Sequence, residues 1–282
     1  MSTITPQAKS EGEEGSAMEA NGMGRNRALR VLTGVLLILT PVAFNVFFTL
    51  LSVTFEYPDI LREPTGYVLR HFDAGGGELV AIWYGFMLTA VLFVPLAVLV
   101  HKALAREDTP YMAVATAFGV VAGVVQFLGL IRWPFLVPYL AETYLDPASS
   151  AATRESAAVV FQAFNQYAGV AVGENLGYLF TGLWTALVAL AMFGSPLPIR
   201  RLLGLLGVVS AACVFVGTFE PAGFEPAADI VVVGYILWSI WLALFGVFLL
   251  LPRSIRQRNL RVKPAGKATT RIESLAGSDN GR

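Results

Sequence analysis

A set of polar side chains lies in or beside the apolar stretches of this chain, where polar groups are costly and usually face protein or water. Arg132 and Glu174 carry opposite charges at the same predicted end of two neighbouring membrane spans. An ion pair between them could border a shared vestibule, and amide side chains beside it could hydrogen-bond a polar ligand. The residues of this candidate pocket are Gln126, Arg132, Gln162, Asn165, Gln166, Glu174 and Asn175.

The same residues also have a structural interpretation. Arg132 could extend its guanidinium to the lipid headgroups, and Glu174 could stabilise the positive end of a helix. The amide side chains could simply face water. A charge swap separates the two interpretations, because paired residues should tolerate Arg132→Glu better when Glu174→Arg accompanies it.

Residues for other chemistry are scarce. His71 and His101 lie on opposite sides of the membrane in the topology argued below, so they cannot share a metal ion. Cys213, the single cysteine, lies within a span and has no redox partner in the chain. The sequence AGGGE at residues 74–78 lacks the strand and the lysine of a phosphate-binding loop and predicts a flexible turn. We therefore expect a noncatalytic protein with no catalytic residues, no metal and no cofactor.

Six long uncharged stretches must position the polar residues. About 20 residues of helix cross the hydrocarbon core of a bilayer. Hydrophobic residues make up 55% of the chain, above the roughly 45–50% of soluble domains. The composition predicts an all-α, polytopic membrane bundle and excludes a water-soluble core. The predicted spans are Val31–Phe55, Leu79–Val100, Tyr111–Ile131, Asn175–Ile199, Leu202–Phe219 and Ile230–Leu251.

Basic residues predict the orientation, because Lys and Arg near a span are retained in the cytoplasm. Connections rich in basic residues alternate with poor ones, and the connection over residues 220–229 has none. Both termini are therefore expected in the cytoplasm, with the protein in the cell membrane. The cytoplasmic set comprises Arg25, Arg27, Arg30, Lys102, Arg106, Arg200, Arg201, Arg253, Arg256, Arg258, Arg261, Lys263 and Lys267, and the external set comprises Arg62, Arg70, Arg132 and Arg154.

Two tails are expected around a six-span domain at residues 27–252. Residues 1–26 combine acids, Gly and Ser with little to bury, which is typical of a disordered cytoplasmic tail. Residues 253–282 are first basic and then polar; their cationic cluster either binds anionic lipid headgroups, at about 1 kcal/mol per charge, or serves only as a topology signal. The bilayer is the expected partner, nucleic acid is not, and no sequence signal defines an oligomeric state.

Residues 156–173 are uncharged but differ from the six spans. Gln162, Asn165 and Gln166 recur at helical spacing and form a polar stripe beside apolar residues. A seventh span would place the two basic termini on opposite sides of the membrane, against the charge pattern. We expect instead an outer-side amphipathic helix over residues 155–172. It either lies in the interface or enters the membrane as a tilted extension of the fourth span.

Several of these segments together resemble a known group of proteins. They are the arginine-flanked first span, the Trp83-Tyr84 start of the second span, and the stretches RWPFLVPYLAETYL (132–145) and ENLGYLFTGLWTALVAL (174–190). Over residues 27–251 the chain is similar to bacterial six-helix integral membrane proteins catalogued as a domain of unknown function. The resemblance implies the six-span layout and brings no activity, substrate or site residue.

Two functional hypotheses follow. The first is a noncatalytic membrane protein with an accessory, sensing or assembly role. The second is a small-molecule transporter or channel with a polar outer-leaflet pocket near the third and fourth spans. Transport favours polar groups in the inner half of the membrane, where the sequence supplies few besides Asn45 and Thr89. A water-accessible cavity that passes the midplane would favour transport, and a closed, dry bundle would favour the first hypothesis.

Overall fold

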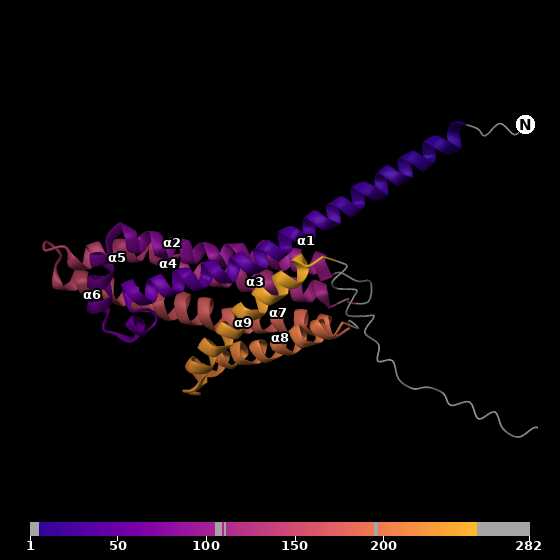
Figure 1. Cartoon of the computed structure of the whole chain (residues 1–282). Coiled ribbons are helices and arrows are strands. Elements are labelled where there is room, and N and C mark those ends of the chain that lie inside the picture. The colour runs from indigo at the N-terminus through magenta and orange to yellow at the C-terminus, as the bar shows by residue number, and fades with distance from the viewer. Residues whose placement is uncertain (1–5, 105–108, 110, 195–196, 253–282) are drawn as a thin grey trace, which may run out of the picture.

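Helices make up almost all of the described chain. The computed structural model describes residues 6–104, 109, 111–194 and 197–252 (Figure 1), with side chains from Gly24 onward. No strand occurs in that part of the chain, so the all-α prediction is confirmed. The elements are α1 (Pro6–Phe55), η1 (Asp59–Arg62), α2 (Thr65–Leu104), α3 (Met112–Leu130), α4 (Arg132–Phe135), α5 (Val137–Leu145), α6 (Ala151–Phe164), η2 (Asn165–Leu176), α7 (Gly177–Phe193), α8 (Pro198–Val216), η3 (Gly217–Ala222) and α9 (Ala227–Leu250).

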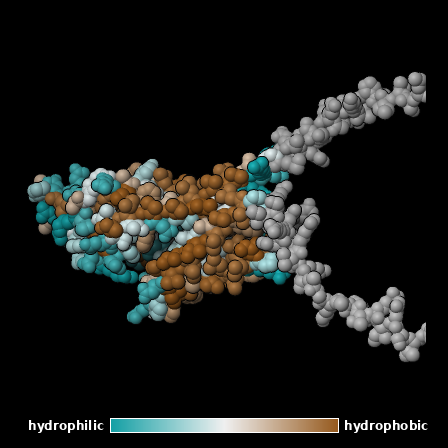
Figure 2. All heavy atoms as spheres, in the orientation of Figure 1, coloured by the Kyte–Doolittle hydropathy of each residue, from teal (hydrophilic) through white to brown (hydrophobic). Residues whose placement is uncertain are grey.

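Six helical segments of the described chain are long and apolar enough to cross a membrane. The predicted number of spans is therefore confirmed, and the chain is a multi-pass membrane protein. On the face shown in Figure 2, apolar atoms form a broad band around the bundle, and hydrophilic atoms gather at the end that carries α5 and α6. The segments are Gly24–Phe55, Thr65–Leu104, Met112–Leu145, Ala151–Phe193, Pro198–Ala222 and Ala227–Leu250.

The long helices form a ring in which each packs against two neighbours. Helices α1, α2 and α3 follow one another around it, α3 then packs on α7, and α7, α8 and α9 lead back to α1. The contact between α1 and α9 includes a polar bond at mid-span, where Nδ2 of Asn45 donates to Oγ of Ser239 at 2.9 Å. The first and last spans of the sequence therefore meet inside the same bundle.

Two hydrophobic clusters fill this ring. The first lies toward the end of the bundle where α2 and α9 end, and Phe93, Trp184 and Trp238 are at its centre. The second lies beneath the cap, our name for η1, the first turns of α2, and helices α4, α5 and α6. Its centre is the stack of Trp83 on Trp133, with ring centroids 4.3 Å apart and planes 8° from parallel. Gln126, one residue of the candidate pocket, lies beside the first cluster, where it lines a small void with Phe93 and Trp238.

The N-terminal residues differ from the prediction. Helix α1 begins at Pro6, so the backbone of residues 6–26 is helical where a disordered tail is expected. Ala, Glu, Lys, Gln and Met in this stretch favour a helix by their intrinsic propensities. A low content of apolar residues limits what such a segment can bury, but it does not prevent helix formation. The expected basic tail at residues 253–282, with its lipid contacts, lies outside the described residues.

The glycine-rich stretch at residues 74–78 lies inside α2 and does not form a loop. Helical turns flank a kink at Gly76, whose φ of 53° and ψ of −150° are conformations that glycine adopts without steric cost. The predicted turn is thus reduced to one residue. As a result α2 extends from the apolar run beginning at Leu79 back to Thr65, and its first turns form one wall of the cap.

Helices α6, η2 and α7 form one helical path from Ala151 to Phe193. Of the two arrangements expected for residues 155–173, the structure has the extension that joins the fourth span. Ser150 caps the start of the path, because its Oγ accepts a hydrogen bond from the backbone N–H of Thr153 at 3.1 Å. In the middle, η2 is a π-helix, a form that is rare and often found at functional sites.

Candidate functional site

Arg132 is buried where α3 meets α4, with 8% of its surface exposed. Its Nη1 donates to the carbonyl oxygen of Gly129, and its Nη2 donates to Oδ1 of Asn165 at 3.1 Å. The guanidinium also lies 5.2 Å from the ring centroid of Trp133, within the range of a cation–π attraction. Three elements, α3, α4 and η2, are therefore joined by one side chain.

Two glycines of η2 allow this close packing. A Cβ at Gly169 would lie 2.5 Å from Nη2 of Arg132, which is too close for two heavy atoms. One turn further on, a Cβ at Gly173 would lie 2.9 Å from Cα of Gly129, so the backbones of η2 and α3 are in contact. The absence of side chains at these positions lets η2 approach α3 closely enough for Asn165 to reach the guanidinium.

The expected ion pair between Arg132 and Glu174 is not formed. Within the described residues no cation lies within ion-pair distance of Glu174, which is half-buried on η2, and none of their groups donates it a hydrogen bond. Two donors of Arg132 are already bound to Gly129 and Asn165. The two charges nevertheless act on one neighbour: burial raises the pKa of the Tyr57 phenol, the charge of Glu174 raises it further, and the charge of Arg132 lowers it. They share an electrostatic environment without contact.

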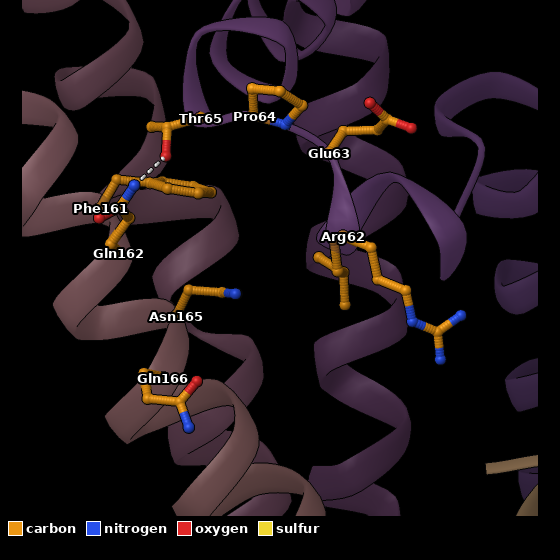
Figure 3. Close-up of a pocket in the computed structure, with 9 residues that line it drawn as sticks. Arg62, Glu63, Pro64, Thr65, Phe161, Gln162, Asn165 and Gln166 are labelled. Atoms are coloured by element: carbon orange, nitrogen blue, oxygen red, sulfur yellow. Dashed lines mark hydrogen bonds between the residues drawn. The ribbon is translucent and has the colours of Figure 1, made fainter. Parts of the chain in front are cut away.

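Three amide residues of the predicted stripe border one cavity of about 430 Å³ in the cap (Figure 3). Nε2 of Gln162 donates across one side to Oγ1 of Thr65 at 3.0 Å. Because Arg132 holds Oδ1 of Asn165, the Nδ2 of Asn165 remains as a donor, and Figure 3 shows it pointing away from its helix toward η1. Gln166 is exposed beside it. The volume falls in the range of about 300–1,000 Å³ that is usual for small-molecule sites.

The other predicted pocket residues lie elsewhere. Nε2 of Gln126 donates to Oγ1 of Thr181 on α7 at 3.1 Å, and Nδ2 of Asn175 donates to the carbonyl oxygen of Thr218 on η3 at 3.1 Å. Both join helices inside the bundle and do not line the cap cavity. The predicted set therefore separates into three cavity residues, the buried Arg132 behind them, and a deeper group that includes Glu174.

The opposite wall of the cavity comes from a segment that is absent from the predicted pocket. It runs from the end of η1 to the start of α2, about 100 residues earlier in the chain, and Figure 3 shows it facing α6 and η2. No pattern in the sequence pairs this segment with residues 155–172. The side chains of this wall and of the adjoining α6 turn are Leu61, Arg62, Glu63, Pro64, Thr65 and Phe161.

Comparison with known proteins agrees with the fold. Residues 32–246, which run from the first spanning helix to the last, match the family model described as Domain of unknown function (DUF4386). No curated protein and no solved structure matches the chain. The match covers most of the chain and confirms the resemblance noted from the segments around Trp83, Arg132 and Glu174. The six-helix bundle with its cap therefore belongs to the DUF4386 family, a domain of unknown function.

Proposed function

We propose that this protein is a noncatalytic protein of the cell membrane that binds a small polar ligand at its outer face, in a sensing or accessory role. The cap cavity carries the proposal. Its amide groups are set on a rigid helical path, and Asn165 is oriented by a buried arginine whose own position is fixed by Gly129 and Trp133. A site whose polar groups are held in place before binding loses less entropy when the ligand arrives.

The lining of the cavity indicates the class of ligand. Amide and hydroxyl groups of Asn165, Gln166 and Thr65 offer both donors and acceptors. Arg62 and Glu63 add one charge of each sign beside them. Arg62 is exposed and also lies 3.6 Å from Asp59, so it is partly neutralised. This combination favours a neutral or zwitterionic solute with several hydrogen-bonding groups.

The packed inner half supports binding in preference to transport. Inside the bundle, a void of only about 20 Å³ is lined by Thr40, Thr89 and Gln126 among others, which leaves room for one water molecule. Beyond it, Phe93 meets Trp184 and Trp238 edge to face, with centroids 4.9 and 5.5 Å away. A transporter, the alternative function, would need polar groups along this part of the bundle.

The orientation belongs to the same proposal. Among the described residues, Arg30, Lys102 and Arg200 lie at the end of the bundle opposite the cap, where α2 ends at Leu104, α8 begins at Pro198 and α9 ends at Leu250. Because basic residues near a span are retained in the cytoplasm, that end is the proposed cytoplasmic side. The cap and its cavity then face outward, where a solute can reach them without crossing the bilayer.

Sided labelling of cysteines tests the proposal. In a Cys213→Ala background, Gln166→Cys places a thiol at the cavity and Thr185→Cys places one in the packed half, where Oγ1 of Thr185 accepts a hydrogen bond from Nε1 of Trp238 at 2.9 Å. A membrane-impermeant maleimide should modify Gln166→Cys in intact cells and should not modify Thr185→Cys from either side. Labelling of Thr185→Cys would reveal an aqueous path and favour transport, and labelling of Gln166→Cys only in inverted vesicles would refute the orientation.

A further inference from the structure

A second polar region lies deeper in the bundle, between the cap and the packed inner half. An unbroken arc of aromatic side chains lies there. Its rings come from the turn before η1, from α1, from α9 and from α7. Each ring is close enough to the next for direct contact between aromatic side chains. The successive centroid separations are 5.6 Å for Tyr57 and Phe48, 6.2 Å for Phe48 and Phe44, 5.7 Å for Phe44 and Tyr235, and 6.0 Å for Tyr235 and Tyr178.

Glu174 lies near both ends of this arc. It precedes Tyr178 by four positions, so the two side chains share one side of the helical path. At the other end its charge acts on Tyr57, as does the opposite charge of Arg132. The carboxylate has no ion-pair partner among the described residues, although it lies within a segment apolar enough to span the membrane. A charge in such a place is costly unless another group compensates it.

The arc and the carboxylate lie around one region of the bundle, which we call the recess and define by Phe44, Phe48, Tyr57, Glu174, Tyr178 and Tyr235. All six residues are half-buried, although they come from four different parts of the bundle. Figure 1 shows α1 and α9 diverging toward the cap from the place where they cross, and Figure 2 shows hydrophilic atoms in a hollow between their apolar faces. The half-buried recess therefore lies where α1 and α9 diverge.

We infer that the recess binds an organic ammonium group. A cation is attracted to the faces of aromatic rings, and several rings together with a carboxylate form the arrangement that recognises ammonium ligands. Glu174 supplies the counter-charge, and the hydroxyls of Tyr57, Tyr178 and Tyr235 supply acceptors for N–H donors. Arg132 makes no ion pair with Glu174, because its Nη1 and Nη2 donate to Gly129 and Asn165. The ammonium group belongs either to a soluble cation or to a lipid headgroup that enters between α1 and α9.

A titration with tetramethylammonium tests the soluble source. The full chain is placed in nanodiscs of phosphatidylglycerol and titrated in a calorimeter. We expect saturable binding that Glu174→Gln weakens at least tenfold. Glu142→Gln is the matched control, because it removes an exposed carboxylate of the cap and changes the net charge equally. Tyr235→Leu should also weaken binding, and Tyr235→Phe should retain it because the ring is kept.

Native mass spectrometry tests the lipid source. The chain is reconstituted with equal amounts of phosphatidylethanolamine and phosphatidylglycerol, and selective retention of phosphatidylethanolamine that Glu174→Gln abolishes would support the inference. Binding of neither probe, or binding that Glu174→Gln leaves unchanged, would overturn it. Should Glu174→Gln fail to fold, equal binding by Tyr235→Leu and the unaltered chain would overturn it as well. The thiol labelling at Gln166 reports on the cap cavity alone, so the two proposals can fail separately.

Discussion

Arg132 shows how a charged side chain is accommodated inside an apolar helical bundle. Its guanidinium combines a backbone acceptor, an amide acceptor and an aromatic face, while its Nε is buried without a partner in the structure. Removing any of these partners from a buried charge is costly, because water cannot replace them. Sequence reasoning located this residue and its charge. It could not choose between a ligand contact and a structural bond, because that choice depends on Asn165, 33 positions away.

The charge swap between Arg132 and Glu174 should fail to restore stability. Arg132→Glu replaces donors to Gly129 and Asn165 by a carboxylate, and we expect a loss of about 3–5 kcal/mol, as for other broken buried charge contacts. Adding Glu174→Arg should recover little of it, because the two side chains are not in contact. Thermal unfolding of the purified single and double variants measures this. A double variant clearly more stable than Arg132→Glu would show that the two charges depend on each other.

Gly169 makes a second residue-level prediction. Gly169→Ala places a Cβ 2.5 Å from Nη2 of Arg132, and the guanidinium cannot move without losing Asn165. We expect destabilisation of about 1–3 kcal/mol, as for overpacked cores. Gly77→Ala is the control, because no atom lies within 4 Å of the position that its added methyl group would take and its φ is not left-handed. It should leave the melting temperature unchanged or raise it slightly. Equal effects of the two substitutions would contradict the close contact at Gly169.

Among the elements, the six spans could be predicted, and the form of the fourth could not. Long apolar runs leave a helix as the only way to satisfy backbone groups in lipid, so the count of spans follows from hydropathy. The stripe of Gln162, Asn165 and Gln166 correctly indicated a helix with a polar face. Nothing in that stripe reveals that the backbone widens into a π-helix from Asn165 to Leu176, because the close approaches in this segment, Gly169 to Arg132 and Gly173 to Gly129, join positions far apart in the sequence.

The two hydrophobic clusters are separate, so we expect the cap to unfold locally while the rest of the bundle stays folded. Trp133 is fully buried against Trp83, and Trp133→Ala should cost about 3–5 kcal/mol. The first cluster, around Trp184, does not depend on this stack, so hydrogen exchange should increase in α5 and in the first turns of α2 while α8 and α9 stay protected. Phe135→Ala, at a neighbouring position that is 63% exposed, should change neither region. Faster exchange throughout the bundle would mean that the clusters unfold as one unit.

The whole molecule combines a cap that holds a cavity with a closely packed half at the opposite end of the bundle. Only one side of the cap cavity could be predicted from the sequence, because three amides on one helical stripe must face the same way. The wall near Arg62 and Thr65 could not be predicted. It is brought to the amides by the kink at Gly76 and the turns around η1. The aromatic recess beside Glu174 was not anticipated, because its rings come from four separated segments. Long-range packing, which single-sequence patterns do not encode, positions both.

Topology gives the last prediction. Reporters fused after positions 105, 197 and 225 should show cytoplasmic signal at the first two and external signal at the third. The reason is geometric: α2 ends and α8 begins at the end of the bundle opposite the cap, whereas residue 225 follows η3 at the far end of α8. An additional crossing within residues 151–173 would invert the signals at 197 and 225 but leave 105 unchanged. Inversion of the whole protein would change all three. The continuous helical path from Ala151 to Phe193 allows only one crossing there, so an external signal at 197 would contradict it.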